Sequence, residues 1–400
     1  MKLLLINKAL LFIFLLSLPL FSQVFSQVNY SGSLGSSFYT FETRTDTSRI
    51  KQLNYYQALQ LRVSPKKYSN VYLSTFLQVA KRGDEGWDKK VYNLFADWKA
   101  KNNWIRVRLG RQFVYQGVIN GTLDGALVSV IPTKNLNVKL FGGLSAPPMR
   151  DFDVLKWDEG NVFGAYASYR FPWEVKLDLS FFQKNRHKEN VWQLFGAGLS
   201  GKYRGVYYLA KLDHNLLTEE LQGMRYLLNY FYKKWSFSAE YNNQKPRIYE
   251  DSYFRIFEIE AYNQFRGGVN YNLKPVQLGL QYLFTSVEYD QTNQVILTAG
   301  IPWGIIGLIY QDGFGGKNTG LYGELRYDFF SKFTARVYSS YYNYERQTTV
   351  ISEDATSFSG GLEYKPFQDL SLRADIQQSI NSIYEDDIRG LFRLNYFFSN

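Results

Sequence analysis

Apolar and polar residues alternate with a period of two along the chain from Val28 onward, in segments separated by turn-forming residues. In segment 175–181 the apolar side chains occupy the odd positions, and in segment 370–377 they occupy the even ones. Because successive side chains on a strand point to opposite faces, each segment would have one apolar face and one polar face. This pattern constrains the fold more than any motif in the sequence, and it predicts an all-β protein.

A water-soluble β-sandwich and a membrane-spanning β-barrel both produce this alternation, so the connections between the segments decide between them. One set of connections is short and contains turn formers, for example 64–67, 132–134 and 171–173. The other set is longer or more polar, for example 113–122 and 145–160. Short turns at one rim and longer loops at the other are typical of outer-membrane barrels.

The segments predict one transmembrane antiparallel up-and-down β-barrel of about 22 strands (range 18–22), with short periplasmic turns and longer extracellular loops. The weakest separations are Tyr203/Gly205, Pro302/Trp303 and the long segment 257–273. The predicted strands are 28–42, 52–63, 70–81, 89–100, 103–113, 122–132, 135–144, 161–171, 174–186, 190–203, 205–215, 223–233, 235–246, 257–273, 275–288, 292–302, 303–312, 317–329, 332–346, 352–366, 369–381 and 387–398.

Aromatic residues are frequent, with 33 Tyr, 31 Phe and 8 Trp. Many of them gather at predicted strand ends, as Trp98, Trp104, Trp173 and Trp303 do. A ring with an apolar body and a polar tip suits the boundary between lipid and water, so these residues would form girdles. The mean hydropathy of −0.31 is nevertheless polar. No apolar run of about 18 residues follows the N-terminus, which excludes a bundle of transmembrane helices.

Residues 1–26 have the pattern of a cleavable secretory signal, because Lys2 and Lys8 precede the apolar run 9–20. A single membrane anchor is the alternative, but the run is short for one. Residues 27–400 would form the barrel, and loss of two lysines would lower the formal charge from +10 to +8. The chain has no cysteine, which excludes disulfides and thiolate chemistry. Its basic residues are spread along the chain and form no long run, so no nucleic-acid partner is expected.

The final predicted strand has one apolar face. This face consists of Phe392, Leu394, Tyr396 and Phe398. The segment resembles the C-terminal strand that the outer-membrane insertion machinery reads, although Ser399 and Asn400 follow the last aromatic residue. The insertion machinery and outer-membrane lipids are therefore expected partners.

The sequence predicts no enzyme, no cofactor and no metal site. The two histidines, His187 and His214, fall near the ends of strands that are not neighbours. Neither a two-histidine metal site nor a Ser–His pair is therefore expected. Acidic pairs such as Glu219 and Glu220 fall in loops, where solvated charge is the simplest interpretation and weak calcium binding is the alternative.

The predicted polar face has more positive than negative side chains. The positive ones are Arg62, Lys99, Arg106, Arg108, Lys139, Arg170, Lys176, Lys184, Arg186, Arg266, Arg326, Arg336, Arg373 and Arg393, and the negative ones are Asp97, Asp178, Glu240, Glu324, Asp328, Glu363 and Asp375. Such a face would favour anions in a lumen, unless the charges pair and only keep the wall wetted. The predicted pore-lining residues are Arg62, Asp97, Lys99, Arg106, Arg108, Lys139, Lys176, Arg336, Arg373, Asp375 and Arg393.

The stretch 108–125 is the most motif-like part of the sequence. A hairpin centred between Gly117 and Val118 would place Arg111 opposite Asp124, so a cross-strand ion pair at the barrel rim is expected. Arg111 breaks the apolar parity of the positions before it, and Gly110 is therefore interpreted as a bulge. The stretch resembles a strand–loop–strand element of porins of the alginate-export type. That resemblance implies a passive outer-membrane channel for anionic or sugar-like solutes.

Two functions fit the predicted barrel. The first is a porin-like channel for small solutes, because a barrel of this size encloses more space than its own wall side chains fill. The loop 145–160, with Pro147, Pro148 and Trp157, is then the best candidate for an inward-folded constriction. The second is a sheath or scaffold around a partner protein, such as a secretion component, a lipoprotein or an electron carrier. Assembly into a homo-oligomer is also left open.

Overall fold

The computed structural model describes residues 27–44, 49–68, 70–83, 85–248, 261–288, 290–314, 316–345, 352–382 and 387–400. The predicted signal sequence, residues 1–26, lies outside the described residues. The described residues form one antiparallel sheet of 22 strands. These strands are β1 (Val28–Arg44), β2 (Arg49–Pro65), β3 (Val71–Arg82), β4 (Trp87–Lys99), β5 (Ile105–Gln116), β6 (Ile119–Thr133), β7 (Leu136–Ser145), β8 (Asn161–Arg170), β9 (Lys176–Arg186), β10 (Glu189–Tyr203), β11 (Val206–Asn215), β12 (Glu220–Tyr232), β13 (Trp235–Gln244), β14 (Tyr262–Asn272), β15 (Gln277–Val287), β16 (Asp290–Ile301), β17 (Gly304–Gly313), β18 (Lys317–Phe329), β19 (Phe333–Glu345), β20 (Ser352–Phe367), β21 (Leu370–Ile380) and β22 (Asp387–Ser399).

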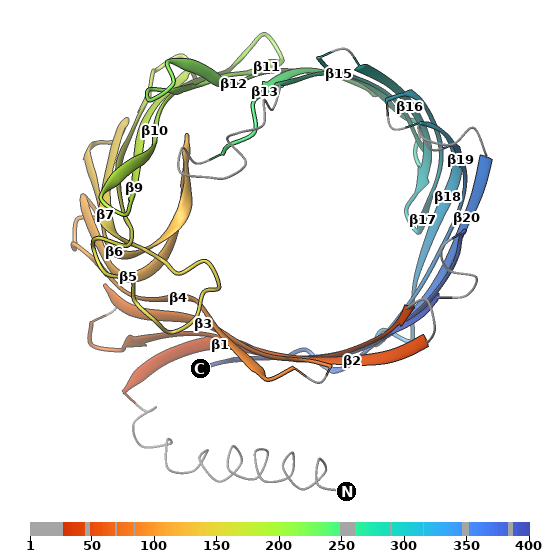
Figure 1. Cartoon of the computed structure of the whole chain (residues 1–400), viewed down its shortest axis with the longest axis horizontal. Coiled ribbons are helices and arrows are strands. Elements are labelled where there is room, and N and C mark those ends of the chain that lie inside the picture. The colour runs from red at the N-terminus through yellow and green to blue at the C-terminus, as the bar shows by residue number, and fades with distance from the viewer. Residues whose placement is uncertain are drawn as a thin grey trace, which may run out of the picture.

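The sheet closes into a barrel because β1 pairs with β2 on one side and with β22 on the other. Every other strand pairs with its two neighbours in sequence, so the barrel is an up-and-down meander, which Figure 1 shows as a ring. At the closing seam, the Asn400 side chain adds hydrogen bonds beyond the last strand. Its Oδ1 accepts from the Tyr30 N–H at 2.7 Å, and its Nδ2 donates to the Val28 carbonyl at 2.9 Å.

The predicted fold class and strand number are confirmed. The predicted contrast between short turns and longer connections is clear at β6–β7 and β7–β8: the first joins Thr133 to Leu136, and the second joins Ser145 to Asn161. It is absent at β9–β10, where two residues join Arg186 to Glu189. Two predicted boundaries are not confirmed. Residues 257–260 of the strand predicted at 257–273 lie outside the described residues. The connection predicted at 113–122 is wrong, because β5 extends to Gln116 and β6 begins at Ile119.

Large apolar side chains occupy alternate positions of the strands and are exposed on the outer surface. Leu109, Leu308 and Ile376 have exposed fractions of 55%, 52% and 59%. The aromatic residues Trp98, Trp104, Trp173 and Trp303 at strand ends are also exposed. An apolar outer wall bordered by aromatic residues suits a lipid environment. No helix in the described part of the chain is long and apolar enough to cross a membrane.

Candidate functional site

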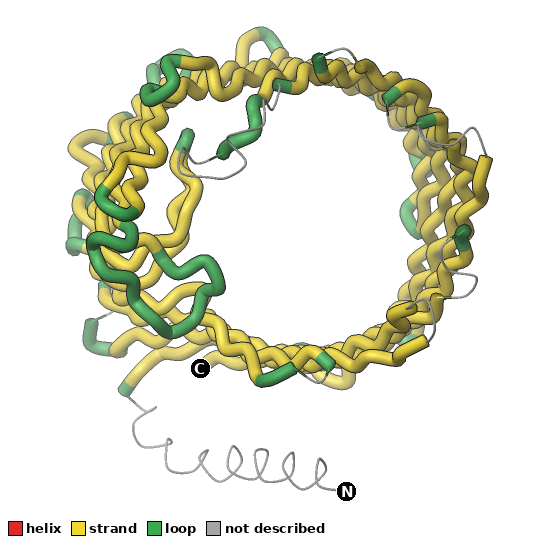
Figure 2. The backbone as a smooth tube through the Cα atoms, viewed as in Figure 1, coloured by secondary structure: helices red, strands yellow, loops and turns green. Residues whose placement is uncertain are grey.

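A hairpin made by the ends of β5 and β6 leaves the barrel wall and lies inside the barrel. Pairing of β5 with β4 ends at Arg111, which is opposite Leu94. Pairing of β6 with β7 begins at Leu123, which is opposite Ser145. Between these points β5 and β6 pair only with each other, down to a turn that joins Gln116 to Ile119. We call residues 111–124 the inner hairpin; Figures 1 and 2 show it directed into the ring.

Two glycines that face each other, Gly110 and Gly125, form the bend where the inner hairpin leaves the wall. Gly110 has a φ of +118°, and a Cβ on it would overlap the Leu94 carbonyl oxygen. A Cβ on Gly125 would likewise overlap the backbone of β7. Only glycine allows this backbone conformation and this close approach. The interpretation of Gly110 as a bulge is wrong, because the register runs through it without a shift.

An apolar core fixes the inner hairpin against the inner face of β7–β10. The hairpin contributes Val114, Val118, Ile119 and Leu123, each no more than 4% exposed. The wall contributes Leu127, Phe141, Val162, Tyr166, Phe182, Trp192 and Leu194. Burying a side chain of this size stabilises by about 1.5–3 kcal/mol. The inner wall is therefore apolar beneath the inner hairpin, and the expectation of a polar inner face is wrong for the part of β7–β10 that the hairpin covers.

Arg111 and Asp124 form an ion pair at the root of the inner hairpin. Nε and Nη2 of Arg111 each donate to a different oxygen of Asp124, at 2.7 Å. The guanidinium also donates to the carbonyl oxygens of Asp151 and Asp153, the second at 2.7 Å. Side-chain exposure is only 6% for Arg111 and 11% for Asp124. One arginine therefore joins both strands of the hairpin to the loop that follows β7.

That loop, residues 146–160, also lies against the inner surface of the wall. The Val91 N–H of β4 donates to the Arg150 carbonyl at 2.7 Å, and the Arg150 guanidinium stacks over the Tyr92 ring at 4.7 Å. Pro147 and Pro148 line a cavity of 310 Å³ together with the inner hairpin and the wall. The prediction that this loop folds inward is confirmed, but the inner hairpin shares the space with it.

The tip of the inner hairpin is attached by groups that are distant in sequence. The Val118 N–H donates to Ser180 Oγ on β9 at 3.1 Å. Arg247, in the connection after β13, forms an ion pair with Asp213 at 2.9 Å and donates to the Val118 carbonyl at 3.5 Å. Arg247 was not predicted as part of this site, since nothing near it in sequence indicates a partner 129 residues away.

The predicted pore-lining residues all lie on the inner face, because the registers connect each of them to the face that carries Phe141. The densest group surrounds Asp97, whose side chain is 1% exposed. Arg106 and Arg108 both donate to this carboxylate, at 2.8 and 3.0 Å. Arg106 also donates to the Tyr72 hydroxyl at 2.6 Å, and Arg62 stacks over the Tyr72 ring at 3.7 Å.

Lys139, Lys176 and Lys99 extend this basic group along neighbouring strands. The Lys176 amine binds Asp178 at 2.7 Å, and the Lys139 amine lies 5.7 Å from the centre of the Tyr166 ring. Lys99 is opposite Arg106 in the register of β4 and β5. These residues and the arginines around Asp97 lie beside the inner hairpin.

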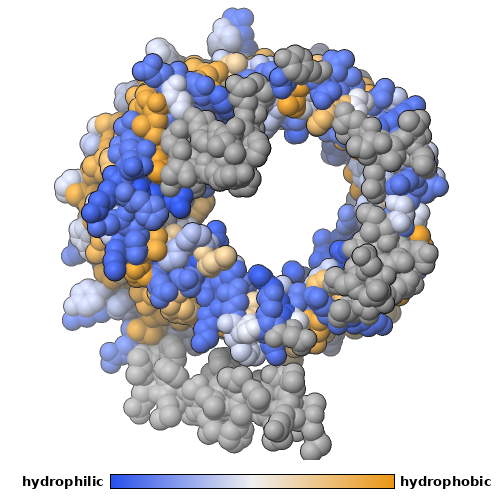
Figure 3. Space-filling view, viewed as in Figure 1, coloured by the Kyte–Doolittle hydropathy of each residue, from blue (hydrophilic) through white to orange (hydrophobic). Residues whose placement is uncertain are grey.

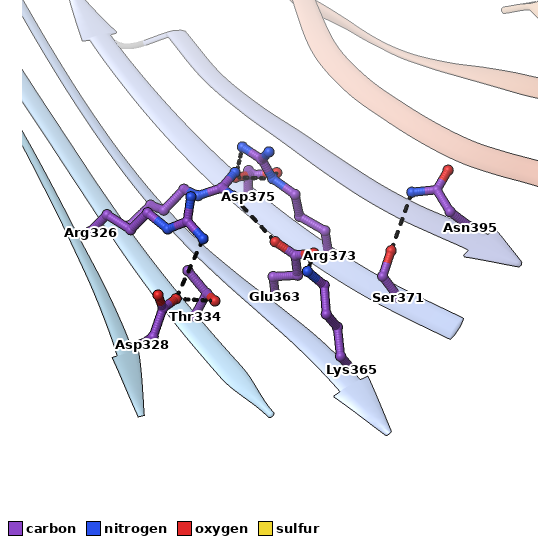
Figure 4. Close-up of polar contacts among 10 residues, drawn as sticks. Arg326, Asp328, Thr334, Glu363, Lys365, Ser371, Arg373, Asp375 and Asn395 are labelled. Atoms are coloured by element: carbon purple, nitrogen blue, oxygen red, sulfur yellow. Dashed lines mark hydrogen bonds and ion pairs between the residues drawn. The ribbon is translucent and has the colours of Figure 1, made fainter. Parts of the chain in front are cut away.

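A second charged group lies on β18–β22 (Figure 4), and Figure 1 shows β18 and β20 on the opposite side of the ring from β5 and β6. Arg373 donates to both oxygens of Asp375, at 2.7 and 2.8 Å. Glu363 contacts Arg336 at 3.3 Å and Lys365 at 3.1 Å. Arg393 is opposite Arg373 in the register of β21 and β22. With Arg326, Glu324 and Asp328 of β18, which share this face, the group has five positive and four negative side chains and is closer to balance than the group around Asp97.

We expect Asp97→Asn to increase the preference for anions, because it removes the carboxylate that compensates two guanidinium groups. The side chain keeps its size and still accepts hydrogen bonds. The measurement is the reversal potential of the reconstituted protein under a KCl gradient. Asp354→Asn is the matched control, since Asp354 is an exposed residue near the start of β20 that accepts hydrogen bonds from Tyr341 and Asn343. Equal shifts in the two variants would contradict the assignment of Asp97 to the ion path.

Solved structures with a similar fold include pores and outer-membrane proteins. The P pilus usher (PapC) translocation pore is 9% identical with a TM-score of 0.53, over 91% of this chain and 99% of that one. OccAB3 of Acinetobacter baumannii is 9% identical with a TM-score of 0.47, over 94% and 100%. The outer membrane protein opdK of Pseudomonas aeruginosa is 12% identical with a TM-score of 0.41, over 94% and 99%. The sequence matches no protein-family model and no curated protein.

At these identities the likeness shows the fold alone. A closed antiparallel barrel with an apolar outer wall is an architecture of outer membranes, and the chain is an outer-membrane β-barrel.

Proposed function

We propose that the chain is a channel for passive diffusion of small solutes across the outer membrane. The observation that supports this most directly is the opening that remains beside the inner hairpin: in the space-filling view of Figure 3, no atoms cover the middle of the ring. A barrel of this size encloses more space than its wall residues fill. The inner hairpin and the loop 146–160 narrow that space from one side only.

The inner face supports a modest preference for anions. On the part of the inner face that carries Asp97 and Asp178, six basic side chains come together, namely Arg62, Lys99, Arg106, Arg108, Lys139 and Lys176, and Asp213 is compensated by Arg247. Fixed charges of one sign raise the local concentration of the opposite ion. At physiological ionic strength, however, the Debye length is about 8 Å, so a wide lumen is only partly influenced by its wall. We therefore propose anionic or sugar-like solutes and expect the preference to weaken as salt is raised.

The resemblance of 108–125 to porins of the alginate-export type also supports this solute class. In the structure, that stretch forms the inner hairpin and its bend. We propose that Arg62, Asp97, Lys99, Arg106, Arg108, Lys139, Lys176, Arg336, Arg373, Asp375 and Arg393 line the path, and that Arg111 and Asp124 hold its narrowest part.

Swelling of proteoliposomes in solutions of single solutes tests the proposed function. We expect small sugars and small organic anions to enter without an energy source, at rates that fall with solute size. Liposomes that stay impermeable to all of them would contradict a channel. A protein that co-purifies in stoichiometric amount after gentle extraction would instead favour the sheath around a partner.

A further inference from the structure

Two tyrosine rings on the inner wall of the barrel cover glycines of the neighbouring strands. Tyr322 of β18 is opposite Gly307, and Tyr342 of β19 is opposite Gly320. A Cβ on Gly307 would overlap the Cζ end of the Tyr322 ring, and a Cβ on Gly320 would overlap Cδ1 and Cε1 of Tyr342. Each ring therefore extends across the neighbouring strand and covers the space that a side chain would occupy there.

The position of these two rings distinguishes them from other aromatic residues that cover a glycine. Phe141 covers Gly164 but is 6% exposed beneath the inner hairpin. Phe398 covers Gly32 on the outer face. Tyr322 and Tyr342 share a face with Arg326 and Arg336, which is the inner face, and both rings are partly exposed. Both rings are therefore accessible from the lumen.

Polar groups border the two rings. Tyr338 lies four residues before Tyr342 on β19, and Glu324 is opposite Tyr338 in the register. One pair further along β18 and β19, Arg326 is opposite Arg336. The surface is thus an aromatic platform that continues into hydroxyl, carboxylate and guanidinium groups.

We propose that Tyr322 and Tyr342 form a stacking site for a pyranose ring inside the lumen, an inference that rests on the proposed function. An aromatic ring is negative on its face, so it attracts the slightly positive C–H groups on the flat side of a sugar. The hydroxyl groups on the edge of the sugar reach Glu324, Tyr338 and Arg336. The site lies on β18–β19, away from the basic group around Asp97.

Saturation-transfer NMR with the purified detergent-solubilised protein tests this site, using maltotriose as the probe. This readout does not depend on conduction, so failure of the site and failure of the channel are distinguishable. We expect maltotriose to bind, and the double variant Tyr322→Ala/Tyr342→Ala to weaken binding roughly tenfold. The double variant Tyr322→Phe/Tyr342→Phe keeps both rings and should retain most of the affinity.

Two further variants separate stacking from general effects on the barrel. Gly320→Ala should also weaken maltotriose binding, because its methyl group displaces the Tyr342 ring without removing it. Tyr310→Ala is the matched control, since Tyr310 is exposed on the outer face, and it should bind like the unaltered protein. Equal affinity in the unaltered protein and the Tyr-to-Ala double variant would overturn the proposal. Binding of benzoate without binding of maltotriose would overturn the assignment to a pyranose.

Discussion

Replacing residues 112–123 by an Asn-Gly turn is expected to roughly double the single-channel conductance, because it removes the inner hairpin from the lumen. The design follows from the register. Arg111 is directly opposite Asp124, and a two-residue Asn-Gly turn joins positions that face each other in a hairpin. The rest of the strand ladder is untouched. The measurement is the step size in planar bilayers at fixed salt.

Two comparisons make this result specific. Deleting 147–158 should also raise conductance, but by less, because the inner hairpin keeps its apolar core. Locking the hairpin in place should leave conductance unchanged. A Val118→Cys/Gly196→Cys pair can do this, since a Cβ on Gly196 would overlap Cγ1 of Val118 and the chain has no other cysteine. An unchanged step size after removal of 112–123 would show that the hairpin does not limit conduction.

Arg111→Ala is expected to release the inner hairpin, at a cost of about 3–5 kcal/mol, because it leaves the Asp124 carboxylate buried without its partner. The loop 146–160 would also lose its bonds from the Arg111 guanidinium. The measurement is hydrogen exchange of the amides of 112–123 in the folded barrel, which should become faster. Noise in the open-channel current should rise for the same reason.

The double variant Arg111→Ala/Asp124→Ala should cost less than the sum of the two single changes, because neither charge is then left unpaired. The matched control is Lys188→Ala. Lys188 pairs with Asp158 at 3.5 Å, but their side chains are 76% and 65% exposed, and such pairs contribute about 0–1 kcal/mol. Exchange rates that are the same in Arg111→Ala and Lys188→Ala would contradict the role of Arg111.

The strands were predictable because each has one face toward lipid and one toward the inside of the barrel. Apolar and polar side chains therefore alternate with a period of two along the sequence. The pairing of Arg111 with Asp124 was also predictable, since the turn between Gly117 and Val118 fixes the register of a hairpin. Arg373 and Asp375 are two residues apart on one strand, so their shared face follows from the sequence as well.

The direction of the inner hairpin could not be inferred in the same way. A hairpin that folds inward has the same local pattern as one that continues the wall. The wall strands that the hairpin covers do carry an indication of its direction. Val162 and Phe163 of β8 are both apolar, as are Leu194 and Phe195 of β10. Such strands have apolar side chains on both faces, which predicts that something covers the inner one. The placement of Tyr322 and Tyr342 over glycines depends on the register between neighbouring strands, which the sequence alone did not supply.

The most direct test of this account is the current that the purified full chain carries in a planar bilayer under a salt gradient. The account predicts discrete, passive conductance steps, with a reversal potential that shows a modest anion preference at low salt and a smaller one at high salt. A correctly folded barrel that carries no current would contradict it.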